Sequence, residues 1–364
     1  MLHRQIPATI ALPNDNDVKP MLKPNETKMF HEAGESADAV ARQLVANDGI
    51  VAELVGKLRA APPRFIVTCA RGSSDHAATF GKYVFETQIG LMTASASPSI
   101  SSIYHAQQKL DGALYIAISQ SGGSPDLVRA ASGAKEAGAH VVALVNVEDS
   151  PLAKVADTVV PLRAGPELSV AATKSYLCAL SALVHIAARW KGDEALYAAL
   201  QATPEAMRAT WAMDWSALVN GLVDASSLFV VGRGLGLGAA QEAALKLKET
   251  CGLHAEAFSS AEVKHGPMAL IGRNFPVLFL TQQDESFAGT REVADEFAAR
   301  GAKVWVASPD AAQAHRLPVA SAPNPVCAPL IAVQGFYKAA NALSIARGHN
   351  PDVPPHLNKV TKTV

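Results

Sequence analysis

The sequence predicts an α/β protein of two tandem doubly wound units, each a flavodoxin-like αβα sandwich with a parallel sheet, followed by a C-terminal tail. Short apolar runs that are typical of buried strands, such as residues 66–70 and 114–118, precede segments with helical patterns. The chain also repeats itself, because a constant shift of 162 residues aligns Arg71 with Arg233 and Gln120 with Gln282. Alternating strands and helices form parallel sheets with right-handed crossovers, so each copy is expected to be one such unit.

The expected strands follow in the same order in both copies, which read strand, glycine turn, helix, strand, turn, helix, strand. The aligned strand segments are residues 66–69 with 228–231, 115–118 with 277–280 and, after one more residue of shift, 138–141 with 301–304. A last short strand is expected at residues 158–162 and at residues 317–320. Each contains a proline, which suits an edge strand because proline has no N–H for the ladder.

The ends and the middle of the chain set the expected domain limits. Residues 193–213 are expected to form a helix and linker between the copies, with Pro204 at a helix start. A proline cluster at residues 351–355 cannot continue a helix and is expected to begin an extended tail. The predicted division is a loosely ordered extension at 1–27, a first unit at 28–205, a second at 206–350 and a tail at 351–364.

Composition restricts the class of function. The chain has 49% hydrophobic and 18% charged residues with a formal net charge of −1, so nucleic acid and acidic membranes are not expected partners. Its four cysteines are far apart and form no CxxC pair, which argues against disulfides or a zinc cluster and suits a reducing cytoplasm. The sequence contains neither a signal-peptide core nor a membrane-length apolar stretch, so the protein is expected to be cytoplasmic.

Two hydroxyl-rich turns of the first copy predict a phosphate site. One is Arg-Gly-Ser-Ser at residues 71–74 and the other is Ser-Gln-Ser-Gly-Gly-Ser at residues 119–124, and each follows an expected strand and opens a helix. Free N–H groups and small hydroxyls at a helix start favour an anion, and two such turns on adjacent parallel strands can close on one phosphate. The alternative is that these serines are ordinary helix N-caps.

The second copy has lost this chemistry. At the matching places it carries Leu235, Gly236, Thr281 and Gln283 in place of the serines. Leucine cannot hold a phosphate. One anion site per chain is therefore expected, in the first copy, with the second copy adapted to another task.

Ionisable residues of the second copy supply candidates for proton transfer. Steps of four and three place Glu242, Lys246 and Glu249 on one face of a helix that begins at the carboxyl edge of the sheet, where ligands bind in open α/β folds. The alternative is a solvated, salt-bridged stripe. His265 stands before Gly-Pro in an exposed turn, where an imidazole suits proton transfer, although a plain loop histidine fits as well.

No cofactor or metal is expected. Residues 234–239 match the GxGxxA dinucleotide fingerprint, but the repeat equates this turn with the serine-rich turn. The segment near Glu256 is also expected to follow a helix directly instead of ending a second strand. His254 and Glu256 are two possible ligands, which are too few for a metal site.

Taken together, these motifs resemble the tandem sugar isomerase (SIS) domain family from residue 28 to the end. The resemblance is greatest to the isomerase half of glucosamine-6-phosphate synthase and to stand-alone SIS-type deaminases. It is carried by residues 70–74, 119–124, 169–174, 242–249, 254–256, 262–267 and 357–359.

The resemblance implies roles for individual residues. The phosphate would be held by Ser73, Ser74, Ser119, Gln120, Ser121 and Ser124, and sugar hydroxyls by the backbone around Val170 and Ala172. Glu249 would move a proton between C1 and C2, with Glu242 and Lys246 lining the pocket. His265 would open the sugar ring in a neighbouring subunit's site, which implies a homodimer, and Lys359 would be the imine-forming lysine of the tail.

The implied activity is conversion of glucosamine 6-phosphate to fructose 6-phosphate and ammonia, with no cofactor. The synthase has an N-terminal glutaminase domain with a cysteine nucleophile, whereas residue 2 here is Leu and fewer than thirty residues precede the matching region. Free ammonia, not glutamine, is therefore expected. The alternatives are galactosamine-6-phosphate deaminase, fructosamine-phosphate deglycase, another aldose–ketose isomerase, or a non-catalytic sugar-phosphate sensor.

Overall fold

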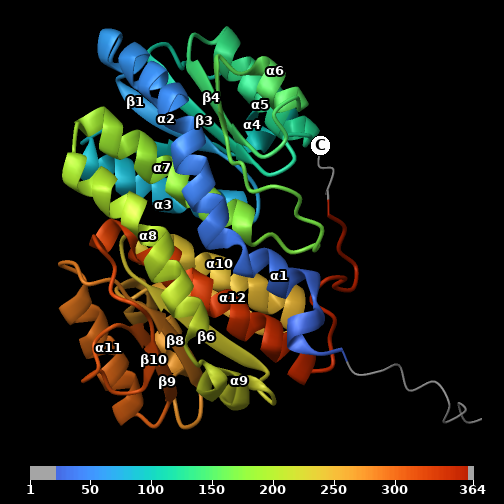
Figure 1. Ribbon diagram of the computed structural model, residues 1–364, viewed down its shortest axis with the longest axis vertical. Coiled ribbons are helices and arrows are strands. Elements are labelled where there is room, and N and C mark those ends of the chain that lie inside the picture. The colour runs from blue at the N-terminus through green and yellow to red at the C-terminus, as the bar shows by residue number, and fades with distance from the viewer. Residues whose placement is uncertain (1–21, 360–364) are drawn as a thin grey trace, which may run out of the picture.

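Two five-stranded parallel sheets form the framework of the computed structural model, which describes residues 22–359 (Figure 1). The first sheet contains β1 (Phe65–Cys69), β2 (Thr93–Ser95), β3 (Ala113–Ser119), β4 (His140–Val145) and β5 (Thr158–Pro161), in the order β2-β1-β3-β4-β5. The second contains β6 (Ser227–Gly232), β7 (His254–Ser259), β8 (Pro276–Leu280), β9 (Lys303–Ser308) and β10 (Arg316–Pro318), in the order β10-β9-β8-β6-β7. When the strands of each sheet are numbered from one, both sheets have the flavodoxin-like order 2-1-3-4-5. The predicted fold class is therefore confirmed.

Helices cover both faces of the first sheet. On the outer face lie α4 (Pro98–Ser102), α5 (Pro125–Glu136) and α6 (Pro151–Val155), and on the inner face lie α2 (Ser36–Ala60), α3 (Ser73–Gln88) and α7 (Lys174–Lys191). The inner face of the second sheet packs on α8 (Glu194–Ala212), α9 (Ser216–Leu222), α10 (Gly236–Cys251) and α12 (Ala328–Ala346). Its outer face packs on α11 (Phe287–Ala299) and the segment with η2 (Glu262–Lys264) and η3 (Pro267–Leu270).

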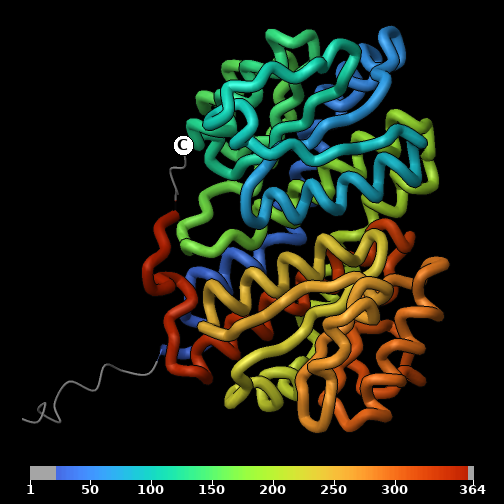
Figure 2. Tube along the Cα trace, turned by 180° about the vertical axis from the view of Figure 1, so that it is seen from behind, coloured from blue at the N-terminus to red at the C-terminus, as the bar shows by residue number. Residues whose placement is uncertain are grey.

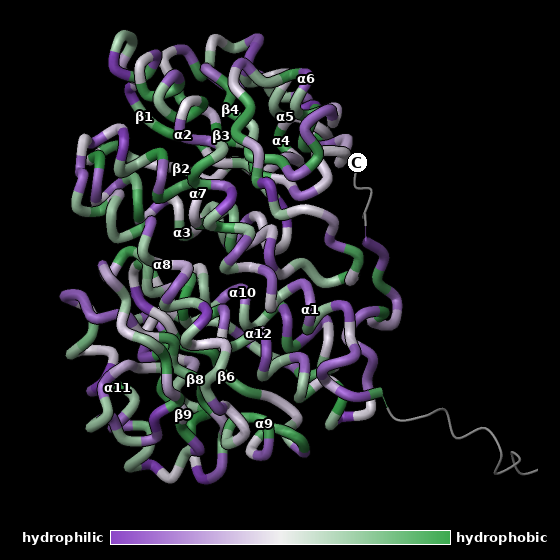
Figure 3. Tube along the Cα trace, viewed as in Figure 1, coloured by the Kyte–Doolittle hydropathy of each residue, from purple (hydrophilic) through white to green (hydrophobic). Residues whose placement is uncertain are grey.

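One continuous hydrophobic core joins the two halves. It runs from the inner face of the first sheet through the central helices to the inner face of the second. Alternate strand residues divide between faces, since Leu114 and Ile116 belong to this core and Tyr115 and Ala117 to the outer one. Figure 3 shows the strands of both sheets mainly in the hydrophobic colour. Because α3 packs directly on α10, residues of the two copies can meet in a shared site.

Several sequence predictions needed correction. Two strands, β2 and β7, were missed, and Glu256 lies within β7 instead of in a segment without a strand. Pro204 lies inside α8, not at a helix start, and the predicted limit between residues 205 and 206 falls within the same helix. The proline-containing strands β5 and β10 do lie at sheet edges, as predicted.

The two ends of the described chain meet. Of the predicted extension, residues 1–21 lie outside the described residues, while Pro24–Glu26 form a short turn before α1 (Lys28–Gly34). The carboxylate of Asp352 accepts hydrogen bonds of 2.8 Å from the backbone N–H groups of Lys28 and Met29, which fixes the start of the tail beside α1 (Figure 2). Across residues 22–359, none of the helices combines the length and apolar character that crossing a membrane demands.

Candidate active site

The two hydroxyl-rich turns open at the same edge of the first sheet. Strands β1 and β3 are hydrogen-bonded neighbours, with Cys69 paired to Ala117 near their carboxyl ends. Strand β2 lies on the other side of β1, so the crossovers diverge between β1 and β3. This divergence is the topological switch point at which doubly wound sheets bind ligands.

The serines of these turns do not act as helix caps. Gly72, at a positive φ of 55°, precedes α3, and Ser73 and Ser74 are its first two residues. Ser124 stands in the N-cap position of α5 without a side-chain capping bond. Within residues 22–359 the hydroxyls of all three serines make no hydrogen bond, so they remain available to a ligand at two helix N-termini.

Local contacts fix the shape of the second turn and join it to the first. The Ser119 hydroxyl accepts a hydrogen bond of 3.0 Å from the Gly122 N–H, and the Ser121 hydroxyl one of 3.3 Å from the Gly123 N–H. The Arg71 guanidinium donates to the buried carboxylate of Asp126 at 2.8 Å. Arg71 belongs to the first turn and Asp126 to the helix after the second. Their ion pair therefore holds the two turns together.

The equivalent place in the second copy is closed by a side chain. The Gln282 amide donates to the Arg233 carbonyl at 2.6 Å, to the Asp284 carboxylate at 3.1 Å and to the Ser286 hydroxyl at 3.0 Å. These contacts connect the two turns of the second sheet without an anion. The carboxylate of Asp284 would also repel a phosphate. This arrangement supports the prediction of one anion site per chain.

Helix α10 carries the predicted row of charges. The Lys246 ammonium lies 3.6 Å from a Glu242 carboxylate oxygen and is hydrogen-bonded to Glu249. Glu242 and Lys246 are buried, whereas the Glu249 side chain is 22% exposed. Burial disfavours the charged form of Lys246, but the two carboxylates outweigh this effect and hold its pKa above the ordinary value. The row is thus a buried ion-pair network with one accessible carboxylate, not a solvated stripe.

Glu242 connects this network to the first copy. It accepts a hydrogen bond of 2.9 Å from the Tyr337 hydroxyl and lies 3.2 Å from Nδ1 of His76 on α3. His76 follows the serine turn closely in the sequence. The helix that begins at the candidate phosphate site therefore contacts the helix that carries the candidate base.

The tail meets the loop that contains Val170 and Ala172. The Lys359 ammonium donates to the Ser169 carbonyl at 2.7 Å and to the buried Glu167 carboxylate at 3.3 Å. Burial alone would raise the pKa of Glu167, but Lys359 and hydrogen bonds from Thr173 and Ser175 hold it below the ordinary value. The Val170 N–H already donates to the Asp352 carbonyl at 3.2 Å, which attaches this loop to the base of the tail.

This loop is also linked to the second hydroxyl-rich turn. The Asn146 N–H donates to the Gln120 carbonyl at 3.1 Å, and its side-chain amide donates to the Gly165 carbonyl at 2.9 Å. Just before Lys359 in the tail, Pro355 and Leu357 line a cavity of about 240 Å³ together with Glu249. Hydrogen bonds therefore lead from the second hydroxyl-rich turn to the loop and the tail, and the tail shares a cavity with Glu249 at the exposed end of the charge row.

His265 stands apart from the other predicted residues. It follows η2 on the surface of the second half, and its backbone N–H donates to the Glu262 carbonyl at 2.9 Å. Its side chain is exposed and makes no hydrogen bond or ion pair with residues 22–359. Within one described chain this imidazole therefore makes no polar contact with Glu242, Lys246 or Glu249.

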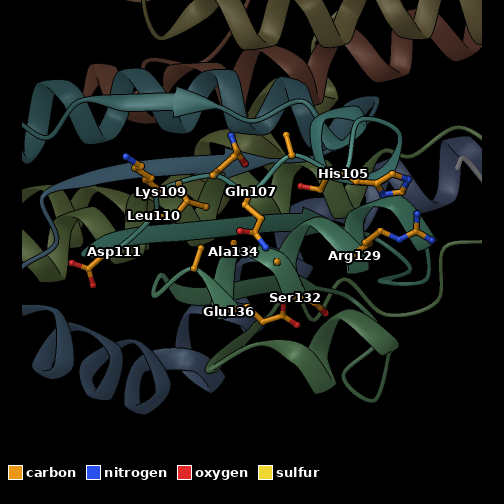
Figure 4. A pocket seen from close by; sticks show the side chains of 14 residues that line it. His105, Gln107, Lys109, Leu110, Asp111, Arg129, Ser132, Ala134 and Glu136 are labelled. Atoms are coloured by element: carbon orange, nitrogen blue, oxygen red, sulfur yellow. The ribbon is translucent and has the colours of Figure 1, made fainter.

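A further cavity of about 690 Å³ lies away from these residues. It opens between α5 and the loop from α4 to β3, and Figure 4 shows His105 and Arg129 near one end with Asp111 near the other. Its lining contains none of the predicted site residues. It is therefore separate from the candidate active site.

Sequence reasoning missed several residues of the site. Glu167 and Tyr337 were not singled out, and His76 and Asp126 were given no role. Glu167 had a local signal, because it stands two residues before segment 169–174, which carries part of the family resemblance. The others contact residues distant in the sequence, for which a single sequence contains no periodic signal.

A known protein family and several known proteins are similar to this chain. The SIS domain family model matches residues 61–189 and 221–308. A glutamine–fructose-6-phosphate aminotransferase (isomerizing) of Sulfolobus acidocaldarius is 31% identical over 91% of this chain and 55% of its own length. The chain spans about half the length of the curated relatives it matches.

Two solved structures have the same fold over nearly their whole length. A Silicibacter pomeroyi DSS-3 protein that bears the name of a phosphosugar isomerase is 42% identical, with a TM-score of 0.86 over 90% of this chain and 100% of that one. The glucosamine-6-phosphate deaminase of Thermotoga maritima is 20% identical, with a TM-score of 0.74 over 93% of this chain and 100% of that one. At that lower identity the second likeness concerns the fold alone.

Proposed function

Since this chain belongs to the SIS domain family, we propose that it is a deaminase that converts glucosamine 6-phosphate to fructose 6-phosphate and ammonia. The observation that carries the proposal is the row on α10, in which buried Lys246 pairs with both buried Glu242 and the partly exposed Glu249. A carboxylate held in this way can move a proton between adjacent carbons without a cofactor.

Phosphate binding would supply the anchoring energy. The hydroxyls of Ser73, Ser74 and Ser124, which have no partner among the described residues, lie at two helix N-termini that open at one edge of the sheet. Ser119 and Ser121 shape the second turn, and Gln120 connects it to the loop at Gly165 through Asn146. Binding energy from a phosphate remote from C1 and C2 can be used to position the reacting carbons.

The chemical steps then follow from the candidate residues. His265 of the partner subunit opens the sugar ring, which makes the active form a homodimer. Glu249 removes the proton from C2 and returns it to C1, so that the amino aldose becomes a ketimine. Water adds at C2 and ammonia leaves, giving the ketose. Lys359 on the tail borders the sugar, as does the backbone around Val170 and Ala172.

The four cysteines of this chain bear on whether its own thiols could release nitrogen from glutamine. Hydrolysis of glutamine by a thiol needs an accessible thiolate. Cys69, Cys178, Cys251 and Cys327 are all buried. Burial raises the pKa of Cys69, Cys251 and Cys327 to about 11 and that of Cys178 further. The cysteines of this chain are therefore unsuited to releasing nitrogen from glutamine.

An ammonia assay over a panel of sugar phosphates tests the proposal. We expect ammonia from glucosamine 6-phosphate, and less or none from galactosamine 6-phosphate and fructosamine 6-phosphate. Glu249→Gln should abolish release while sugar-phosphate binding persists, and Glu256→Gln, at an exposed position on β7, should leave the rate unchanged. Absence of ammonia from every compound would refute deamination and leave isomerisation or sensing.

A further inference from the structure

The cavity beside Glu249 contains an imidazole that the steps above do not use. Its lining consists of Lys248, Glu249, Gly252, His349, Pro355 and Leu357. Lys248 and Glu249 lie in the last turns of α10, Gly252 follows that helix directly and His349 follows α12, whereas Pro355 and Leu357 belong to the tail. If Glu249 acts at C1 and C2, these carbons lie at this cavity, and His349 forms another wall of it.

Backbone geometry holds the His349 ring against the end of α10. The His349 N–H donates to the Ser344 carbonyl at 2.9 Å, after Gly348 with a φ of 79°. Opposite the ring, Gly252 ends α10 in the left-handed conformation with a φ of 56°. A Cβ at Gly252 would lie 2.9 Å from Nε2 of His349, so the glycine also makes room for the ring.

Among the described residues, the His349 ring has no polar contact that would give it a structural role. Neither ring nitrogen makes a hydrogen bond or ion pair with residues 22–359, although the side chain is half-buried. By contrast, the buried His185 lies 3.4 Å from the Asp48 carboxylate. An imidazole with free nitrogens at a cavity that also exposes a carboxylate is suited to proton transfer.

We propose that His349 is the catalytic residue that carries protons during hydrolysis of the ketimine, an inference that rests on the proposed function. Glu249 completes its part when C1 has gained the proton from C2. Water then forms the C2–O bond, the π pair of the C=N bond moves to nitrogen, and the water proton passes through the imidazole to that nitrogen. In the second stage the C2–N bond breaks with its electron pair on nitrogen. His349 delivers a proton to the departing ammonia and receives the proton of the C2 hydroxyl, which leaves the ketone.

If His349 has this role, two measurable reactions, exchange of the C2 hydrogen and release of ammonia, depend on different residues. Exchange of the C2 hydrogen with solvent needs Glu249, whereas ammonia release needs both residues. For His349→Asn we expect ammonia release to fall by about a hundredfold to ten-thousandfold, the usual contribution of a general acid–base group. Exchange at C2 of glucosamine 6-phosphate in D₂O, followed by proton NMR, should continue at a rate near that of the wild type.

Controls make the result specific. His356→Asn changes an exposed histidine of the same tail and should alter neither rate. His349→Gly should regain ammonia release when imidazole is added, which a structural role would not produce, and thermal unfolding would confirm that the variants are folded. Wild-type ammonia release by folded His349→Asn, or an equal loss of release and exchange, would overturn the assignment. A wild-type protein that releases no ammonia would instead refute the proposed function itself.

Discussion

Nδ1 of His76 lies 3.2 Å from a carboxylate oxygen of Glu242, and this contact joins the two halves of the molecule at the candidate site. His76 is in the first turn of α3, two residues after Ser74 of the turn proposed to hold phosphate. Glu242 is fully buried on α10, in the same network as Lys246. A ligand bound at the start of α3 would thus contact a helix that is hydrogen-bonded to α10, which carries the candidate base Glu249.

Removing this imidazole should destabilise the protein. His76→Ala leaves the buried Glu242 carboxylate with one polar partner fewer, at a cost of about 1–3 kcal/mol in the free energy of unfolding. Urea denaturation would measure the loss. His254→Ala, at an exposed position on the edge strand β7, is the control and should change stability little. Equal stability of the two variants would contradict a structural contribution of the His76–Glu242 contact.

The serine turn should govern affinity for the phosphate group. Ser74→Ala removes a hydroxyl at the start of α3 and should weaken binding of glucosamine 6-phosphate by about tenfold or more, since a hydrogen bond to a charged group contributes about 1.5–3 kcal/mol. Isothermal titration would measure the affinity. Gln283→Ala, in the matching turn of the second copy, should leave affinity unchanged because Gln282 closes that turn. Glucosamine without phosphate should bind both variants equally weakly.

The parts of the structure that the sequence predicted are those with local signals. Strands β3 and β8 are continuous apolar runs, and the turns after β1 and β3 carry their hydroxyls within a few residues of the strand ends. Strand β2 was missed because it has only three residues, Thr93–Ser95, and β7 because exposed His254 and Glu256 interrupt its apolar pattern.

The contacts that assemble the site could not be predicted in this way. The residues of the His76–Glu242 pair are 166 positions apart, and those of the Lys359–Glu167 pair 192. Each half of such a pair is an ordinary polar residue in its own segment. The two residues of each pair meet only in the folded chain, so a single sequence without homologues gives no indication of the pairing.

The tail contact should make stability depend on acidity. The pKa of Glu167 is held below its ordinary value of 4.5, so its contribution is fully present above that pH and is lost as the pH falls through the lower folded-state pKa. Glu167→Gln should therefore lower the melting temperature by roughly a few degrees at neutral pH. The difference from wild type should shrink as the pH falls below about 4.5.

Thermal unfolding across this pH range would check the expectation. Glu148→Gln removes an exposed ion pair with Arg163 at 3.2 Å and is the matched control, since such pairs contribute little. If the difference in melting temperature between wild type and Glu167→Gln stays constant with pH, the negative charge of Glu167 does not contribute to stability.

The proposed exchange of His265 between subunits has a direct test in mixed dimers. Glu249→Gln and His265→Ala should each be inactive alone, because one lacks the carboxylate and the other the imidazole. When the two variants are unfolded, mixed in equal amounts and refolded, half of the dimers should contain one subunit of each kind. If His265 serves the partner's site, each mixed dimer has one intact site out of two, and the mixture should recover about a quarter of the wild-type rate. If His265 instead serves its own subunit, every site in the mixture lacks one group, and no activity should return. Size-exclusion chromatography would establish that the refolded mixture is dimeric before the ammonia assay.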